Sequence, residues 1–68
     1  MDAAKIDEWL ASLDEIGTRI GFLVGELLEA GDIERSPDVR NNLETCLDSM
    51  TTAIDYLVAA DKNLRTLR

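Results

Sequence analysis

The sequence has no histidine, one cysteine, one proline, and a single residue each of tryptophan, tyrosine and phenylalanine among its 68 residues. Without histidine and with one thiol, the chain lacks the usual zinc ligands and cannot close an internal disulfide. It also has no Cys-x-x-Cys pair, no phosphate-binding glycine loop, and no nucleophile with a suitably spaced base. We therefore expect no enzyme activity, no catalytic residues, no metal site and no cofactor. Cys46 falls within a periodic apolar pattern, which favours a buried thiol in a reducing compartment.

Long apolar runs are also missing. Gly-x-x-x-Gly patterns promote helix packing in membranes, but they need an apolar segment of about 20 residues. Here Arg19 and Glu26 bracket only six uncharged residues. Acidic residues precede any apolar segment at the N-terminus, which is not typical of a signal peptide. We expect a cytoplasmic protein that does not contact membranes.

Positive charge is scarce. The chain holds 7 basic and 14 acidic residues, a formal net charge of −7. Residues 1–34 hold nine acids and two bases, whereas residues 35–68 hold five of each, so the excess negative charge lies in the first half. Such a surface repels nucleic-acid backbones and anionic lipids. Direct binding to nucleic acid is therefore not expected.

The sequence is rich in apolar residues at helical spacing, and it predicts helices over about residues 4–30 and 37–67. Steps of three and four residues place side chains on one face of a helix. In the first segment the main row is Ile6, Trp9, Leu13, Ile16, Ile20, Leu23, Leu27 and Ala30; in the second it is Val39, Leu43, Cys46, Met50, Ala53, Leu57, Ala60, Leu64 and Leu67. We expect these two rows to pack against each other.

Residues 31–36 form the predicted connection. Gly31 is a typical helix stop. Ser36-Pro37-Asp38 then favours a new helix, because the serine hydroxyl can cap it, proline suits its first position, and the aspartate opposes the positive end of the helix dipole. A loop this short makes the helices antiparallel neighbours. The prediction is one all-α domain over residues 1–68, an antiparallel two-helix hairpin.

Glycines at positions 17, 21 and 25 stand beside the first apolar row. Each glycine inside a helix costs roughly 1 kcal/mol relative to alanine. We interpret them as a ridge that lets another helix approach closely; the alternative is that they only weaken the helix or allow a bend near Gly21. Further apolar residues widen both faces. The predicted oligomer interface comprises Leu10, Gly17, Gly21, Val24, Gly25, Leu28, Leu47 and Ile54.

A hairpin of this length buries little apolar surface against the conformational entropy that folding removes. We therefore expect a homo-oligomer, most simply a dimer that forms a four-helix bundle. In length, hairpin plan and mixed large and small rows, the chain resembles in outline the dimeric plasmid copy-number regulator Rop and the hairpin co-chaperones of type III secretion needle subunits. Rop binds RNA through a basic helix face, which the acidic charge of this chain disfavours.

Three functions remain open at this point. The first is a protein–protein interaction module (adaptor, chaperone or regulator) that acts through apolar helix faces on another protein. The second is an acidic inhibitor of the phage type that occupies the nucleic-acid site of an enzyme. The third is a helical oligomer with a small ligand between its subunits. Residues predicted for a partner contact are Phe22, Glu26, Glu29 and Glu34, although a lone exposed Phe22 is also common on soluble proteins.

Overall fold

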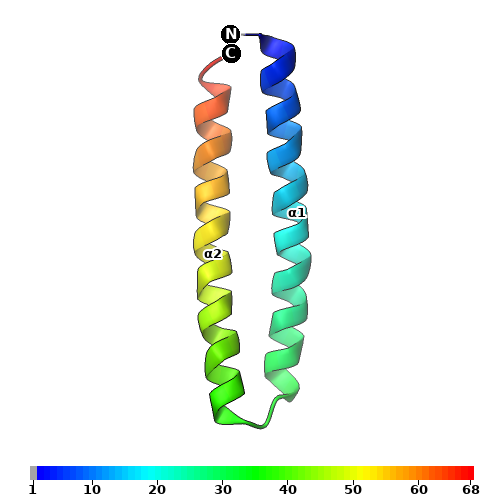
Figure 1. Ribbon diagram of the computed structural model, residues 1–68, viewed down its shortest axis with the longest axis vertical. Helices are drawn as coiled ribbons and strands as arrows, with labels where there is room; N and C mark the ends of the chain where they lie inside the picture. Colours follow the sequence, from blue (N-terminus) through cyan, green and yellow to red (C-terminus); the bar gives the residue numbers. More distant parts are fainter. Residues whose placement is uncertain (1) are drawn as a thin grey trace.

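Two helices make up the fold. The computed structural model describes residues 2–68, with α1 spanning Ala3–Ile33 and α2 spanning Pro37–Arg65. The helices run antiparallel, and both chain ends lie at the same end of the rod (Figure 1). The rod extends 51 × 15 × 10 Å along its principal axes. The predicted all-α antiparallel hairpin is confirmed.

Both helices begin at a side-chain cap. The Asp2 carboxylate accepts a hydrogen bond from the Ala4 N–H at 3.0 Å. The Ser36 hydroxyl accepts one from the Val39 N–H at 3.4 Å, with Pro37 at the first helical position. These bonds satisfy amide groups that have no partner within the helix. The second helix thus begins at the residue that the sequence predicts, and for the predicted reason.

The first helix ends later than expected. The sequence places its end at Ala30, whereas α1 continues to Ile33 and Gly31 lies inside it without a positive φ. The Glu34 N–H donates to the Ala30 carbonyl at 3.1 Å. Its carboxylate accepts hydrogen bonds from the amides of Arg35 and Ser36, each at 3.0 Å. The side chain of Glu34 therefore organises the turn that the sequence assigns to Gly31.

The second helix ends earlier than expected, at Arg65 instead of about Leu67. The last amides donate to carbonyls three residues earlier in the chain instead of four: the Leu67 N–H donates to the Leu64 carbonyl at 3.1 Å, and the Arg68 N–H donates to the Arg65 carbonyl at 3.3 Å. This tightening satisfies carbonyls that the helix leaves unpaired at its end. It also brings Arg68 back toward α1, where its guanidinium lies 2.9 Å from the Asp7 carboxylate.

The glycines do not interrupt α1, which passes through positions 17, 21 and 25 as one helix. A Cβ atom built at any of these glycines meets no heavy atom outside its own helix within 4 Å. Within a single hairpin, therefore, the absence of a side chain is not used for close packing against α2.

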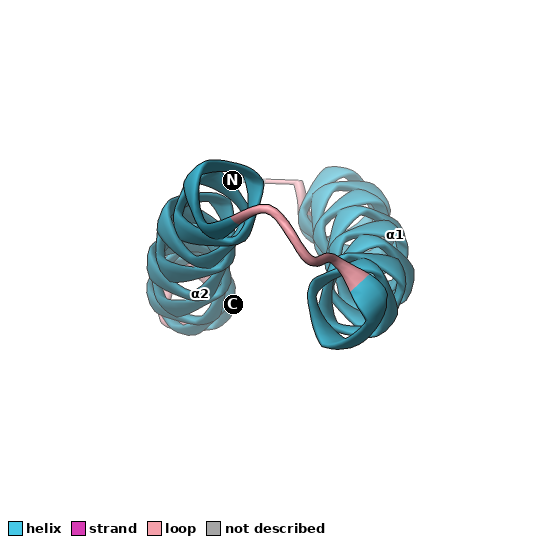
Figure 2. Cartoon of the chain, turned by 90° about the horizontal axis from the view of Figure 1, so that it is seen from below, coloured by secondary structure: helices cyan, strands magenta, loops and turns pink. Residues whose placement is uncertain are grey.

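The core of a single hairpin is small. Among the described residues, only Ile6 (0% exposed) and Leu10 (8% exposed) are buried. The remaining contact surface is half-buried and comprises Leu13, Gly17, Ile20, Val24 and Leu27 of α1 with Leu43, Met50, Leu57 and Leu64 of α2. Seen end-on, the two helices lie side by side, and no other element covers either broad side of the pair (Figure 2).

The α1 side of this contact differs from the sequence prediction. Trp9, Ile16 and Leu23 belong to the row expected to face the second helix, yet they remain 39%, 46% and 42% exposed. Leu13, Ile20 and Leu27 of that row do face α2, where they are joined by Leu10 and its heptad neighbours Gly17 and Val24. The apolar face of α1 is wide enough for either the row of Trp9 or the row of Leu10 to face α2. Relative to the prediction, α1 is rotated about its axis so that the row of Leu10, which contains Gly17, faces α2.

Candidate interaction surfaces

One broad side of the hairpin carries two uncharged rows, which we call the open apolar face. Trp9 and Leu13 of α1 border the same groove as Ala60 and Leu67 of α2, which places the two rows on one side of the molecule. Residues seven positions apart lie on the same side of a helix, so each row continues along that side in steps of seven residues. The open apolar face comprises Trp9, Ile16, Leu23 and Ala30 of α1, and Val39, Cys46, Ala53, Ala60 and Leu67 of α2.

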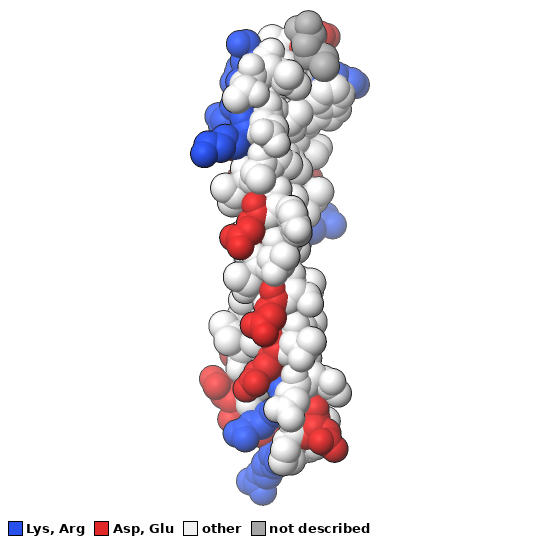
Figure 3. Space-filling model, turned by 90° about the vertical axis from the view of Figure 1, so that its left-hand side faces the viewer, with Lys and Arg blue, Asp and Glu red and all other residues white. Residues whose placement is uncertain are grey.

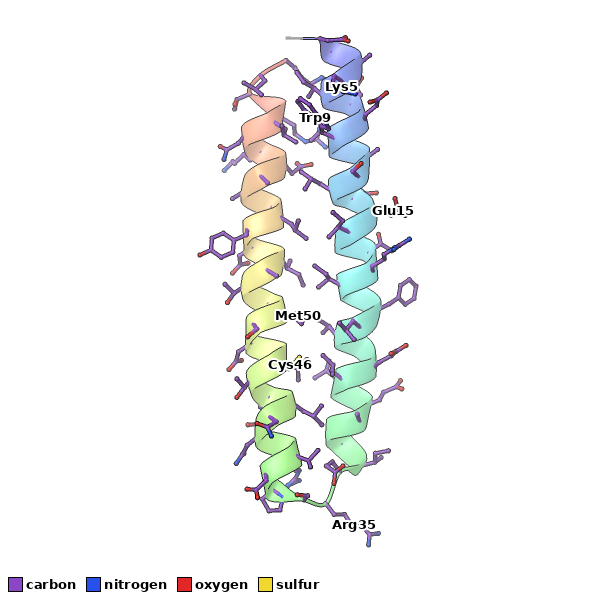
Figure 4. The ribbon with its side chains drawn as sticks, in the orientation of Figure 1. Lys5, Trp9, Glu15, Arg35, Cys46 and Met50 are labelled. Atoms are coloured by element: carbon purple, nitrogen blue, oxygen red, sulfur yellow. The ribbon has the colours of Figure 1, made fainter. Side chains whose placement is uncertain are left out.

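The groove at the open end of the hairpin encloses ≈ 730 Å³ and is lined mainly by carbon atoms. Trp9 lies between the two helices there, near the chain termini (Figure 4). Farther along α2, Cys46 and Met50 are half-buried and lie on the side that faces α1 (Figure 4). The half-buried position of Cys46 agrees with its place in the apolar pattern.

The two rows of the open apolar face are complementary in size. Trp9 borders a groove that Ala60 and Leu67 both line, and because the helices are antiparallel, a heptad step along α1 toward the loop corresponds to a heptad step back along α2. Ile16 then lies between the levels of Ala53 and Ala60, Leu23 between those of Cys46 and Ala53, and Ala30 between those of Val39 and Cys46. Over most of the face a large residue of α1 therefore stands beside a small residue of α2.

Hydroxyl groups beside the open apolar face are already satisfied by their own helices. Ser12 donates to the Glu8 carbonyl at 3.1 Å. Ser49, which stands between Cys46 and Ala53 on the surface of α2, donates to the Thr45 carbonyl at 3.1 Å. Covering these residues would leave no hydroxyl donor unpaired, so desolvation of this rim costs little.

The opposite broad side is charged. One groove on this side is bordered by Asp14, Asp61 and Arg65, and another, near the loop, by Asp32, Arg40 and Glu44. Arg65 bonds to Asp61 at 2.7 Å. This hydrogen bond, and then the attraction between the charges, raises the pKa of Arg65, so the pair stays ionised wherever Asp61 is charged. Covering this side requires that several charges be desolvated.

The eight residues of the predicted oligomer interface are not gathered on one open surface. Leu10 is buried within the hairpin, and Gly17, Val24, Leu47 and Ile54 are half-buried beside the other helix. Only Gly21, Gly25 and Leu28 are exposed. Most of the row that the sequence assigns to a second chain thus contributes to the contact between α1 and α2. The row left uncovered is the one that contains Trp9.

The residues predicted for a partner contact lie mostly on the outside of α1. Phe22 is 73% exposed, and Glu26 and Glu29 are exposed without an ion pair among the described residues. Arg19, by contrast, bonds to Glu15 at 3.1 Å, and Glu15 points outward from α1 (Figure 4). Glu34 belongs to the loop instead, where it is half-buried and holds two backbone amides.

The narrow outer surface of α2, which faces away from α1, has a different distribution of charge. Acidic side chains form a line along the outer surface of α2, and basic side chains gather toward its two ends (Figure 3). Both signs are present in the second half of the chain, which holds five acids and five bases. The concentrated negative charge therefore belongs to α1 and the loop.

Within residues 2–68, no group of three or more His, Cys, Asp or Glu side chains is placed to hold a metal ion. Neither α1 nor α2 contains a stretch that is both long and apolar enough to cross a bilayer.

No protein-family model, curated protein or solved structure matches this chain.

Sequence reasoning identified the apolar positions and placed Ile6, Leu13, Ile20 and Leu27 correctly against α2, but it also placed Trp9, Ile16 and Leu23 there. The two sides of the hairpin differ in the residues of α2 that accompany each α1 row. The glycine side is accompanied by Asp61, whereas the row of Trp9 faces a strip of alanine and cysteine. An uncharged strip suits a surface that becomes covered.

Proposed function

We propose that this protein is a helical protein–protein interaction module of the adaptor, chaperone or regulator type that works as a homodimer through apolar helix faces. Its surface carries the argument. A compact monomer of 7.5 kDa exposes about 4,200 Å², whereas this hairpin exposes 5278 Å². The excess of about 1,000 Å² is close to the roughly 800 Å² that each partner buries in a standard interface.

The excess surface is also of the right chemical kind. Trp9, Ile16 and Leu23 expose large apolar areas in one row, with no charged residue among them. Contiguous exposed apolar surface of this kind marks an interaction site in soluble proteins. A dimer would leave the acidic outer surface of α1 accessible to a further protein partner.

Sedimentation equilibrium between about 1 and 100 μM tests this proposal, because a dimer with a dissociation constant in the micromolar range or below is resolved over that span. We expect a mass of twice the chain, and helical circular dichroism that falls on dilution along with the dimer fraction. A fully helical monomer throughout that range would remove the basis of the proposal.

A second candidate function is an acidic inhibitor that occupies the nucleic-acid-binding site of an enzyme. The observation that favours it is the cluster on the outside of α1, where Phe22 stands among the exposed carboxylates Glu26 and Glu29. An exposed aromatic ring surrounded by negative charge can anchor on a basic surface that attracts it over long range.

Reversing two charges separates this function from the first. We expect Glu26→Lys with Glu29→Lys to leave the dimer intact, because Glu29 lies outside the open apolar face and Glu26 stands only at its rim, where a lysine keeps its charge in water. Glu34 is kept because its carboxylate holds the loop. Partners captured from host extract are identified by mass spectrometry at low and high salt. Nucleic-acid enzymes that bind the native protein, elute with salt and are lost with the double variant would favour the inhibitor.

A further inference from the structure

We infer that the open apolar face binds a second copy of this chain in one particular orientation, with the two-fold axis parallel to the helices and both loops at the same end. This inference rests on the proposed dimer and deepens it. It names the surface, the occupant and the symmetry.

The size pattern of the face selects the orientation. Rotating a copy by 180° about an axis parallel to the helices places α2 of the copy over α1 while keeping the levels along the rod. Ile16 then enters the space between Ala53 and Ala60 of the copy, Leu23 the space between its Cys46 and Ala53, and Trp9 the space between its Ala60 and Leu67. An isologous contact of this kind repeats every pairing twice, so that large residues enter the space above small ones along most of the interface.

The other face-to-face arrangement lacks this fit. An axis perpendicular to the helices would place α1 over α1 of the copy, and α2 over α2. Large residues would then meet large ones, with Trp9, Ile16 and Leu23 holding the hairpins apart. The strip that contains Ala53 and Ala60 would face another small strip and leave empty space, which forfeits packing energy.

The chemistry of the face also favours a second copy over a differently charged partner. Its two rows contain no ionisable group other than the Cys46 thiol, and the Ser12 and Ser49 hydroxyls on its rim bond to their own helices. The chain carries a net charge of −7, and the uncharged face is where two such chains can meet with the least repulsion. The opposite side would bring Asp14 and Asp61 into the contact.

A size-swap experiment tests the pairing. Ile16→Ala should raise the dimer dissociation constant at least about 30-fold by leaving a cavity in both copies of the contact. Ala53→Ile should raise it at least about tenfold by overpacking. The double variant restores one large and one small residue per contact, so its dissociation constant should return to within about tenfold of the native value. Phe22→Ala and Val58→Ala, at positions 73% and 62% exposed outside the open apolar face, are the matched controls and should stay unchanged.

A distance measurement tests the orientation without depending on these variants. A spin label is placed at Arg35→Cys in the loop of a Cys46→Ala protein, with Ser12→Cys as a second site. If the two-fold axis is parallel to the helices, both loops lie at one end of the dimer. The spacing between packed helices then predicts a distance of about 10–20 Å between the two loop labels. The perpendicular axis separates them by a distance close to the rod length of 51 Å.

The outcomes separate the inference from the proposal on which it rests. A native protein that stays monomeric contradicts both. A dimer with loop labels far apart, or a dimer that the size swap does not rescue, overturns this orientation and leaves the dimeric module standing. A dimer that is insensitive to Ile16→Ala but lost on Leu28→Asp places the contact on the opposite side and overturns the inference in the same way.

Discussion

Ile6→Asp is expected to unfold the protein. Ile6 is the one fully buried side chain of the described hairpin, with 0% of its surface exposed. Its neighbour Asp7 already pairs with Arg68 across the two helices. A second carboxylate at position 6 would be buried without a partner of its own, at a cost of several kcal/mol. A domain this small has a total stability of only about 3–5 kcal/mol from its core. Helical circular dichroism at 25 °C should therefore be mostly lost.

Tyr56→Asp is the matched control, because Tyr56 is 73% exposed in the middle of α2. Its neighbours three and four positions away are Ala53, Ala59, Thr52 and Ala60, so the new carboxylate meets no like charge along the helix. Surface changes of this kind usually shift stability by no more than about 0.5 kcal/mol. If Ile6→Asp and Tyr56→Asp lost the same amount of helical structure, the buried contacts around Ile6 would not be the main source of the hairpin's stability.

The hairpin could be predicted from the sequence because its signals are local. Ser36, Pro37 and Asp38 specify a helix start through their own hydrogen bonding and backbone geometry, and the structure places the start of α2 there. The end of α1 could not be predicted in the same way. Gly31 is a common stop signal, but the helix continues because Glu34 supplies two hydrogen bonds to the loop amides. A side chain that folds back on later residues leaves no periodic pattern.

The rotation of α1 about its axis was the other feature that local signals did not determine. Apolar residues occupy both Trp9 and Leu10, Leu23 and Val24, and Leu27 and Leu28, so two overlapping rows satisfy helical spacing. In the folded hairpin the row of Leu10 faces α2, and Gly17 of that row is half-buried. That choice leaves the bulkier row of Trp9, Ile16 and Leu23 exposed in the single chain. Which row becomes covered depends on contacts between helices, and these are distant in sequence.

Gly17→Ala, Gly21→Ala and Gly25→Ala together are expected to stabilise the protein by roughly 2–3 kcal/mol, because each glycine inside a helix costs up to about 1 kcal/mol relative to alanine. The added methyl groups have room, since a Cβ at each position meets nothing within 4 Å in the hairpin. None of the three glycines belongs to the open apolar face. Urea unfolding at a fixed protein concentration measures the gain, because a dimer's stability depends on its concentration.

The same triple variant decides which side of α1 the second chain covers. If the contact lies on the open apolar face, the dimer dissociation constant should change by less than about threefold. If the glycine ridge is the contact, as the sequence predicts, three methyl groups would push the second helix away and weaken the dimer at least about tenfold. Gly31→Ala is the control, because it also lies in α1 with free space around it but outside the ridge. A triple variant that is more helical as a monomer and yet fails to dimerise would restore the glycine ridge as the interface.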